Sequence, residues 1–174
     1  MTRNPPAPRL FVVLARSAPV GVILRRGPSD WVQIIKWQTD TDTFEAGQWI
    51  KARVYEGSCN LSPDGKLFIY YVLQGSNWTR NPEVGMRYTA ISKPPYFTAL
   101  VVWPGRWGAH FIDDRTVHIW ADSVQDPMFQ VPHLKVVGKD FELSVVPETQ
   151  DAPDRHSWIY ISNGYKAQLK GDVE

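Results

Sequence analysis

Short apolar runs separated by turn residues follow one another along almost the whole of this 174-residue chain. The runs are four to eight residues long, as in strands, whereas a helix needs about ten residues with apolar positions three or four apart. Fourteen prolines and twelve glycines interrupt the pattern throughout, and the sequence therefore predicts an all-β protein. The expected strands are 10–15, 20–24, 31–38, 48–55, 67–73, 88–91, 96–103, 117–120, 128–131, 134–137, 141–146 and 158–161.

Three of these runs have informative patterns. Residues 67–73 are apolar throughout, which predicts a strand buried on both faces in the middle of a sheet. The turn before it places Pro63 and Gly65 where a type I turn and a left-handed residue are expected. Residues 48–55 alternate between long amphipathic and small apolar side chains, as in a half-buried strand. Residues 31–38 have mixed polarity on both faces, which suggests a strand covered on both sides.

The length of the chain accommodates one domain. We predict a compact antiparallel β sandwich or barrel-like domain over residues 10–163. Residues 1–9 contain three prolines and are expected to form a flexible arm. Residues 164–174 are expected to be a C-terminal tail that forms a short helix or frays.

Two short segments resemble parts of β-propellers. Residues 61–67, Leu-Ser-Pro-Asp-Gly-Lys-Leu, are similar to the turn between blade strands in WD-repeat and Tol-type propellers. Residues 114–120, Asp-Arg-Thr-Val-His-Ile-Trp, look like the strand that closes a WD-repeat blade. This resemblance implies a small or incomplete β-propeller as the alternative fold. Residues 31–55 and 90–100 also resemble bacterial proteins of no known function, which implies a bacterial origin and no particular activity.

Charge and cysteine content narrow the class of protein. The net charge is +1, which disfavours nucleic acid or an anionic membrane as the partner. No segment approaches the roughly 18 apolar residues of a membrane helix. Cys59 is the only cysteine, so a disulfide within the chain is impossible. We expect a cytoplasmic protein, since a lone thiol fits a reducing compartment.

One cluster suggests metal chemistry. His110, Asp113, Asp114 and His118 fall within nine residues of a predicted hairpin, 108–120. Two imidazoles and a carboxylate could hold zinc or iron in an open site. The hairpin favours another interpretation, because both aspartates occupy its turn while the histidines lie back along its arms. We therefore predict an Asp-Asp turn with packed histidines, and no metal or other cofactor.

Motifs that carry catalysis are missing from the sequence. It contains no Gly-x-Ser-x-Gly elbow, no Cys-x-x-Cys pair and no glycine-rich phosphate loop. Cys59 precedes a buried strand, where a cysteine is usually an inert small apolar residue. These observations favour a non-catalytic protein, although two distant carboxylates could still serve a glycosidase.

Aromatic side chains are the one excess in the composition, with eight Trp, seven Tyr and seven Phe. Exposed Trp and Tyr mark protein interfaces or flat platforms for sugars and bases, although loops could instead bury them. We expect a non-catalytic protein-binding or scaffold module of a bacterial complex that docks another protein through aromatic loops and strand edges. A homo-oligomer is compatible with such edges, and the alternative is a carbohydrate- or nucleotide-binding domain, with or without catalysis, that uses an aromatic cleft. The candidate partner-binding residues are Trp78, Trp103, Arg106, Trp107 and Trp158.

Overall fold

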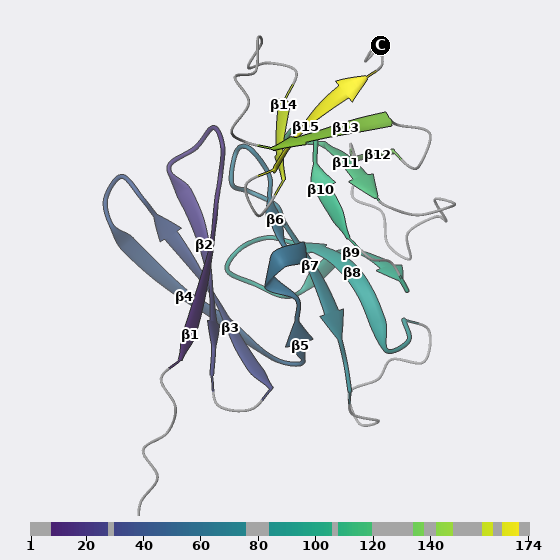
Figure 1. Cartoon of the computed structure of the whole chain (residues 1–174). Coiled ribbons are helices and arrows are strands. Elements are labelled where there is room, and N and C mark those ends of the chain that lie inside the picture. The colour runs from purple at the N-terminus through teal and green to yellow at the C-terminus, as the bar shows by residue number, and fades with distance from the viewer. Residues whose placement is uncertain are drawn as a thin grey trace, which may run out of the picture.

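The structure is a computed structural model of the chain (Figure 1). It describes residues 8–27, 30–75, 84–105, 108–119 and 134–137, and the backbone of three further strands at 142–147, 158–161 and 165–170. The described elements are strands and one short 3-10 helix, η1 (Glu56–Ser58). All strand pairs but one are antiparallel, and no sheet closes into a barrel. The predicted all-β antiparallel sandwich is confirmed.

The N-terminal strands form a four-stranded meander, sheet A, in the order β1-β2-β3-β4. Its strands are β1 (Arg9–Leu14), β2 (Val20–Arg26), β3 (Trp31–Gln38) and β4 (Thr43–Lys51). Ala52 then leads the chain out of sheet A and directly into the next sheet. The predicted strand 48–55 is thus divided between two sheets, while its expected alternation holds, with Ala52 and Val54 buried and Lys51 and Arg53 exposed.

Sheet B lies beside sheet A and has the order β5-β7-β8-β9, with β6 also paired to β7. Its strands are β5 (Arg53–Val54), β6 (Asn60–Leu61), β7 (Phe68–Leu73), β8 (Arg87–Ser92) and β9 (Ala99–Pro104). Five of the six residues of β7 are buried, and the strand has neighbours on both sides. The prediction of a central strand buried on both faces is confirmed.

Two small sheets complete the described structure. Sheet C contains β10 (Ala109–Phe111), β11 (Thr116–Ile119) and β12 (Lys135–Val137), and its first two strands form the predicted hairpin. Sheet D contains β13 (Glu142–Pro147), β14 (Trp158–Ile161) and β15 (Tyr165–Lys170).

The expectation of a helical or frayed tail is wrong for residues 165–170. These residues form β15, which pairs with β13 on one side and β14 on the other. The sequence did carry a local signal, because residues 165–170 alternate apolar with polar side chains, and β15 follows β14 after only three residues, as in a hairpin. Strand structure therefore continues to Lys170. At the other end, β1 already begins at Arg9, and residues 1–7 of the expected arm lie outside the described residues.

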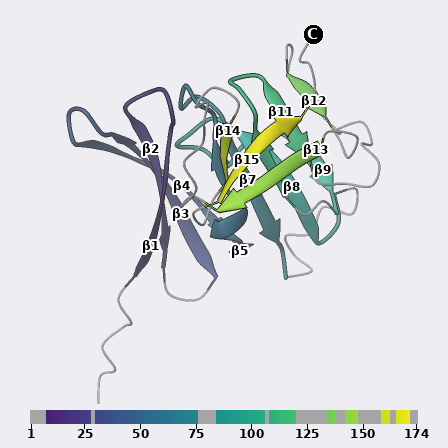
Figure 2. The same ribbon diagram turned by 45° about the horizontal axis from the view of Figure 1, so that its top comes forward.

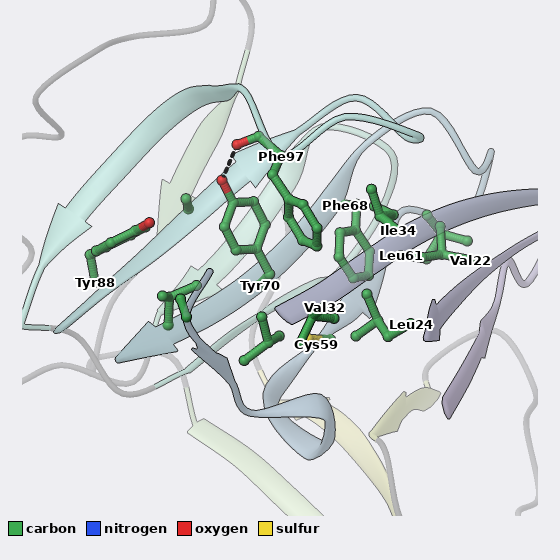
Figure 3. Packing of buried hydrophobic residues seen from close by; sticks show 14 of the residues in the cluster. Val22, Leu24, Val32, Ile34, Cys59, Leu61, Phe68, Tyr70, Tyr88 and Phe97 are labelled. Atoms are coloured by element: carbon green, nitrogen blue, oxygen red, sulfur yellow. Dashed lines mark hydrogen bonds between the residues drawn. The ribbon is translucent and has the colours of Figure 1, made fainter. Parts of the chain in front are cut away.

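The main hydrophobic core lies between sheets A and B (Figure 3). Sheet A contributes a row of branched aliphatic side chains that includes Val22 and Ile34, and sheet B contributes aromatic side chains that include Phe68 and Tyr70. The Tyr70 hydroxyl donates a hydrogen bond to the carbonyl oxygen of Phe97 inside this core. Figure 2 shows sheet A as a separate layer beside the other sheets.

A second core lies on the opposite face of sheet B. Successive residues of a strand point to opposite faces, so Phe68 and Tyr70 face sheet A while Ile69 faces the other way. Ile69 packs there with Trp103 of β9 and with apolar residues of sheet C such as Phe111. Sheet B is therefore covered on both faces, and sheet A on its inner face.

The turn at residues 62–65 joins three of the sheets. The carbonyl oxygen of Pro63 accepts a hydrogen bond from the Ser17 amide, which follows β1. The Asp64 amide donates to Oδ1 of Asp114 in sheet C at 2.8 Å. Gly65 has the expected left-handed backbone, with φ of 72°. The two segments that resemble a propeller blade thus belong to different sheets, and the sheets stack in layers, which favours the sandwich over the propeller alternative.

Candidate docking face

Of the five residues predicted to bind a partner, the described structure places the side chain of one. Trp103 ends β9, and its side chain is 1% exposed in the second core. Its position at a strand end suggested that Trp103 is exposed, but sheet C packs over that end. The prediction of an exposed binding residue is therefore wrong for Trp103, which belongs to the core. Trp78, Arg106 and Trp107 lie outside the described residues, and for Trp158 only the backbone in β14 is described.

The two histidines of the proposed metal cluster face each other across the β10–β11 hairpin. His110 pairs with His118 in the ladder, and their ring centroids are 5.1 Å apart. Both side chains are buried at 4% exposure. Burial, together with the charges of the nearby His118 and Arg16, lowers the pKa of His110 to about 3. A neutral imidazole is therefore the favoured form of His110 at neutral pH.

The two aspartates of that cluster bind backbone groups of the turns. Oδ1 of Asp113 accepts hydrogen bonds from the amides of Arg115 and Thr116, both at 2.7 Å. Oδ1 of Asp114 accepts from the Asp64 amide. Within the described part of the chain, no three His, Cys, Asp or Glu residues gather as a group that could hold a metal ion.

The single thiol lies inside the main core. Cys59 is buried, and its Sγ is 3.4 Å from the carbonyl oxygen of Tyr55. Burial raises the pKa of the Cys59 thiol, which disfavours the nucleophilic thiolate. In this environment Cys59 acts as a small apolar side chain.

The exposed apolar surface of the described structure gathers instead on one face of sheet A, the face that points away from sheet B. Register along the four strands aligns its side chains in rows, for example Val12 with Ile23 and Ile35. We call this set of residues the outer face. Its members are Leu10, Val12, Leu14, Ile23, Arg25, Trp31, Gln33, Ile35, Trp37, Phe44, Ala46, Trp49 and Lys51.

A β-bulge gives the outer face its aromatic character. Phe44 and Trp49 are five residues apart on β4, so in a regular strand they would point to opposite faces. The register between β3 and β4 shifts between Gln33 and Ile35, and β4 gains one extra residue there. Both rings consequently face outward, where they are 57% and 43% exposed.

Two glycines allow tryptophan rings to lie close against the sheet. A Cβ atom at Gly21 would be 3.2 Å from Cε3 of Trp37, and one at Gly27 would be 3.3 Å from Cζ3 of Trp49. Any larger residue at either position would have to displace the ring. Trp37 also stacks on Phe44, with ring centroids 5.8 Å apart. The Trp37 and Trp49 rings thus contact the backbone of β2 and of the residue after it.

The size and charge of the outer face distinguish it from an ordinary surface. Leu10, Val12, Leu14, Trp31, Phe44 and Trp49 are all large apolar residues that are exposed by more than two fifths. Together they expose about 600 Å² of apolar surface, at the upper end for the largest patch of a monomer. Positive charge accompanies this surface at one end, where the Arg25 guanidinium lies 5.7 Å from the centroid of the Trp49 ring and Lys51 pairs with Trp31.

Sequence reasoning missed this face for an identifiable reason. The mixed pattern of 31–38 suggested cover on both sides, but Trp31 is exposed on its outer side and Trp37 is half-buried. In β1 the exposed Leu10, Val12 and Leu14 alternate with half-buried neighbours, but residues 10–15 are apolar throughout in sequence, and burial in β3 does not alternate. Only the register between strands shows that the outward side chains of β1 and β3 belong to one face.

Comparisons with known protein families, with curated proteins and with solved structures found no match to this chain. The described residues contain no helix that is long and apolar enough to cross a membrane. The chemistry of the outer face therefore carries the functional argument.

Proposed function

We propose that this protein is a non-catalytic binding module that docks another protein on the outer face of sheet A. The observation that carries the proposal is the apolar surface of about 600 Å² on one sheet face, rich in Trp, which is at the upper end for the largest patch of a monomer, a patch that is often functional. Trp and Arg are also the residues most enriched among those that dominate binding energy at interfaces. Trp49 and Arg25 supply this combination near one end of the face.

The outer face also indicates the chemistry of the partner surface. A sheet face fits a flat or gently convex surface, and its apolar side chains, aliphatic in the central row and aromatic toward both ends, call for apolar contacts. Arg25 and Lys51 lie on the same face near Trp49 and Trp31. We expect the partner to present an apolar patch with a carboxylate close to one end, because opposite charges steer association and fix orientation.

A pair of matched variants tests this function. Trp49→Ala removes an exposed ring of the outer face, whereas Met86→Ala removes a side chain of similar exposure, 46%, that precedes β8 of sheet B. A partner isolated with the wild-type protein should be purified and titrated by calorimetry. Trp49→Ala should weaken binding by about tenfold or more, as for an interface hot spot, and Met86→Ala should leave the affinity within about twofold. Equal affinities for the wild type and Trp49→Ala would refute the proposal.

Two tryptophan rings on one sheet face, each in contact with a glycine, favour a second candidate function, binding of an oligosaccharide. Trp37 lies against Gly21 of β2 and Trp49 against Gly27, which follows β2; the two glycines are six residues apart, a distance of roughly 20 Å in an extended strand. Two such rings could stack on sugar rings of one extended chain. Titration of the tryptophan fluorescence with a panel of oligosaccharides separates the two functions, because saturable quenching that Trp49→Ala removes would support the sugar and its absence would support the protein partner.

A further inference from the structure

The two edges of sheet A differ in how they are protected. At the β4 edge, the Gln48 amide donates to the carbonyl oxygen of Pro95, and the Gln48 side chain accepts from the Phe97 amide at 2.7 Å. A loop of sheet B therefore covers this edge. At the other edge β1 pairs only with β2 among the described strands. Beyond Arg9, β1 carries none of the usual edge protections, such as a charge, a proline or a bulge.

The backbone of β1 presents a defined set of hydrogen-bonding groups at this open edge. The Ala15 amide donates to the carbonyl oxygen of Val20, so Ala15 is directed toward β2. In an antiparallel pair, residues directed toward the neighbour alternate with residues directed away from it. The amide and carbonyl groups of Leu10, Val12 and Leu14 consequently point away from β2 into the open edge.

We propose that β1 pairs antiparallel with β1 of a second copy of this chain. A two-fold axis at Val12 matches every outward-directed group, because Leu10 then lies opposite the partner's Leu14 and Val12 opposite the partner's Val12. Three such pairs exchange about six hydrogen bonds. A shift of the register by two residues leaves only two of the three pairs, so the register centred on Val12 is the most favourable.

The side chains agree with this register. Residues directly opposite each other in an antiparallel pair point to the same face, so the exposed Leu10, Val12 and Leu14 meet their equivalents on the outer face. On the core side, Phe11 meets the partner's Val13, and both side chains are half-buried. Arg9 meets the partner's Ala15, so no like charges oppose each other. The net charge of +1 adds little repulsion between copies.

The proposed dimer does not depend on the proposed docking function, but it would change how the outer face is presented to a partner. A two-fold axis normal to the sheet joins the two copies of sheet A into one eight-stranded sheet, with both outer faces on the same side. The contact consists of one strand edge from each copy, which is small for a specific interface, so we expect a weak dimer with a dissociation constant on the order of micromolar. Each dimer would present two copies of the Trp49 surface to a partner.

Cysteine cross-linking tests the register directly, since the native Cys59 is buried. Opposite Cα atoms in a hydrogen-bonded pair are about 5.5 Å apart, inside the roughly 4.4–6.8 Å range of disulfides. Val12→Cys should therefore give a covalent dimer when oxidised with copper phenanthroline. Leu10→Cys alone should not, because the two copies of position 10 would be about 14 Å apart, whereas Leu10→Cys with Leu14→Cys should. Equal cross-linking of Val12→Cys and Leu10→Cys would overturn the proposal.

Sedimentation of the unmodified chain gives the independent check. Between about 1 and 200 µM the wild type should pass from monomer to dimer, and Val12→Glu, which places two carboxylates face to face at the axis, should stay monomeric. Trp49→Ala should dimerise like the wild type, which separates this result from the docking function. A wild type that remains monomeric over the whole range, or a Val12→Glu variant that still dimerises, would overturn the proposal.

Discussion

The contact between β4 and the loop at residues 93–98 should be sensitive to a single methyl group. Gly47 lies so close to this loop that a Cβ atom would be 1.9 Å from the carbonyl oxygen of Pro95 and 2.4 Å from its Cβ. On the other side the same atom would be 2.8 Å from the carbonyl oxygen of Ile34. Two of these three atoms are backbone oxygens, which cannot move away as the end of a flexible side chain could. Gly47→Ala must therefore displace the loop or distort the bulge.

The cost follows from the interactions that hold the loop. Forcing a methyl group into a packed region costs about 1–3 kcal/mol. Displacement of the loop also weakens the hydrogen bonds from the Gln48 amide to Pro95 and from the Phe97 amide to the Gln48 side chain, at about 1 kcal/mol each. Alanine restricts the unfolded chain and returns about 0.4–1 kcal/mol. We expect Gly47→Ala to lower the free energy of unfolding by about 3 kcal/mol.

Urea denaturation followed by tryptophan fluorescence measures this change. At an m value of about 2 kcal/mol per M, the midpoint should fall by about 1.5 M. Gly75→Ala is the matched control, because no atom lies within 4 Å of its added Cβ, and its stability should stay within about 0.5 kcal/mol of the wild type. A Gly47→Ala variant as stable as Gly75→Ala would refute the close packing of this loop against β4.

Two further predictions concern charged groups. Arg26→Ala should lower the free energy of unfolding in urea by about 2 kcal/mol, because it leaves the partly buried Glu56 carboxylate without the guanidinium that lies 2.6 Å away. The control Arg25→Ala removes an exposed cation and should lower it by less than about 1 kcal/mol. Equal losses for the two variants would contradict this role of Arg26. Because the pKa of His110 is lowered to about 3 in the folded protein, the unfolded chain binds a proton at this histidine more tightly than the folded chain does. The free energy of unfolding should therefore be highest above about pH 6.5 and should fall by about 1 kcal/mol per pH unit as the pH drops toward 3. His110→Gln should flatten this slope in denaturation curves between pH 7 and 4, and an unchanged slope would show that other groups cause it.

The local sequence pattern was sufficient to predict structural features that depend on adjacent residues, such as a turn or a fully apolar strand. The turn before β7 needed only Pro63 and Gly65, and the burial of β7 followed from its unbroken apolar run. The tail was mispredicted although its residues 165–170 alternate apolar with polar side chains and follow β14 after only three residues. The prediction that Trp103 is exposed was wrong because side chains of sheet C pack over the end of β9.

The candidate site depends even more on long-range arrangement. The extra residue that places Phe44 and Trp49 on one face is visible only as a register shift against β3. The closeness of Trp37 to Gly21 likewise joins two strands whose pairing the sequence alone does not specify. Composition did indicate an excess of aromatic side chains, and we expected exposed rings in the loops, whereas the described structure locates exposed rings on a sheet.

Photo-cross-linking in the cells that produce this protein tests the docking claim most directly. A benzophenone amino acid should replace Trp49 on the outer face in one variant and Met86 near sheet B in another, since both positions are exposed. Irradiation at position 49 should give one dominant adduct with a different protein, with little of it at position 86. Adducts of equal yield at both positions, or no adduct at position 49 beyond a second copy of the chain, would contradict the account.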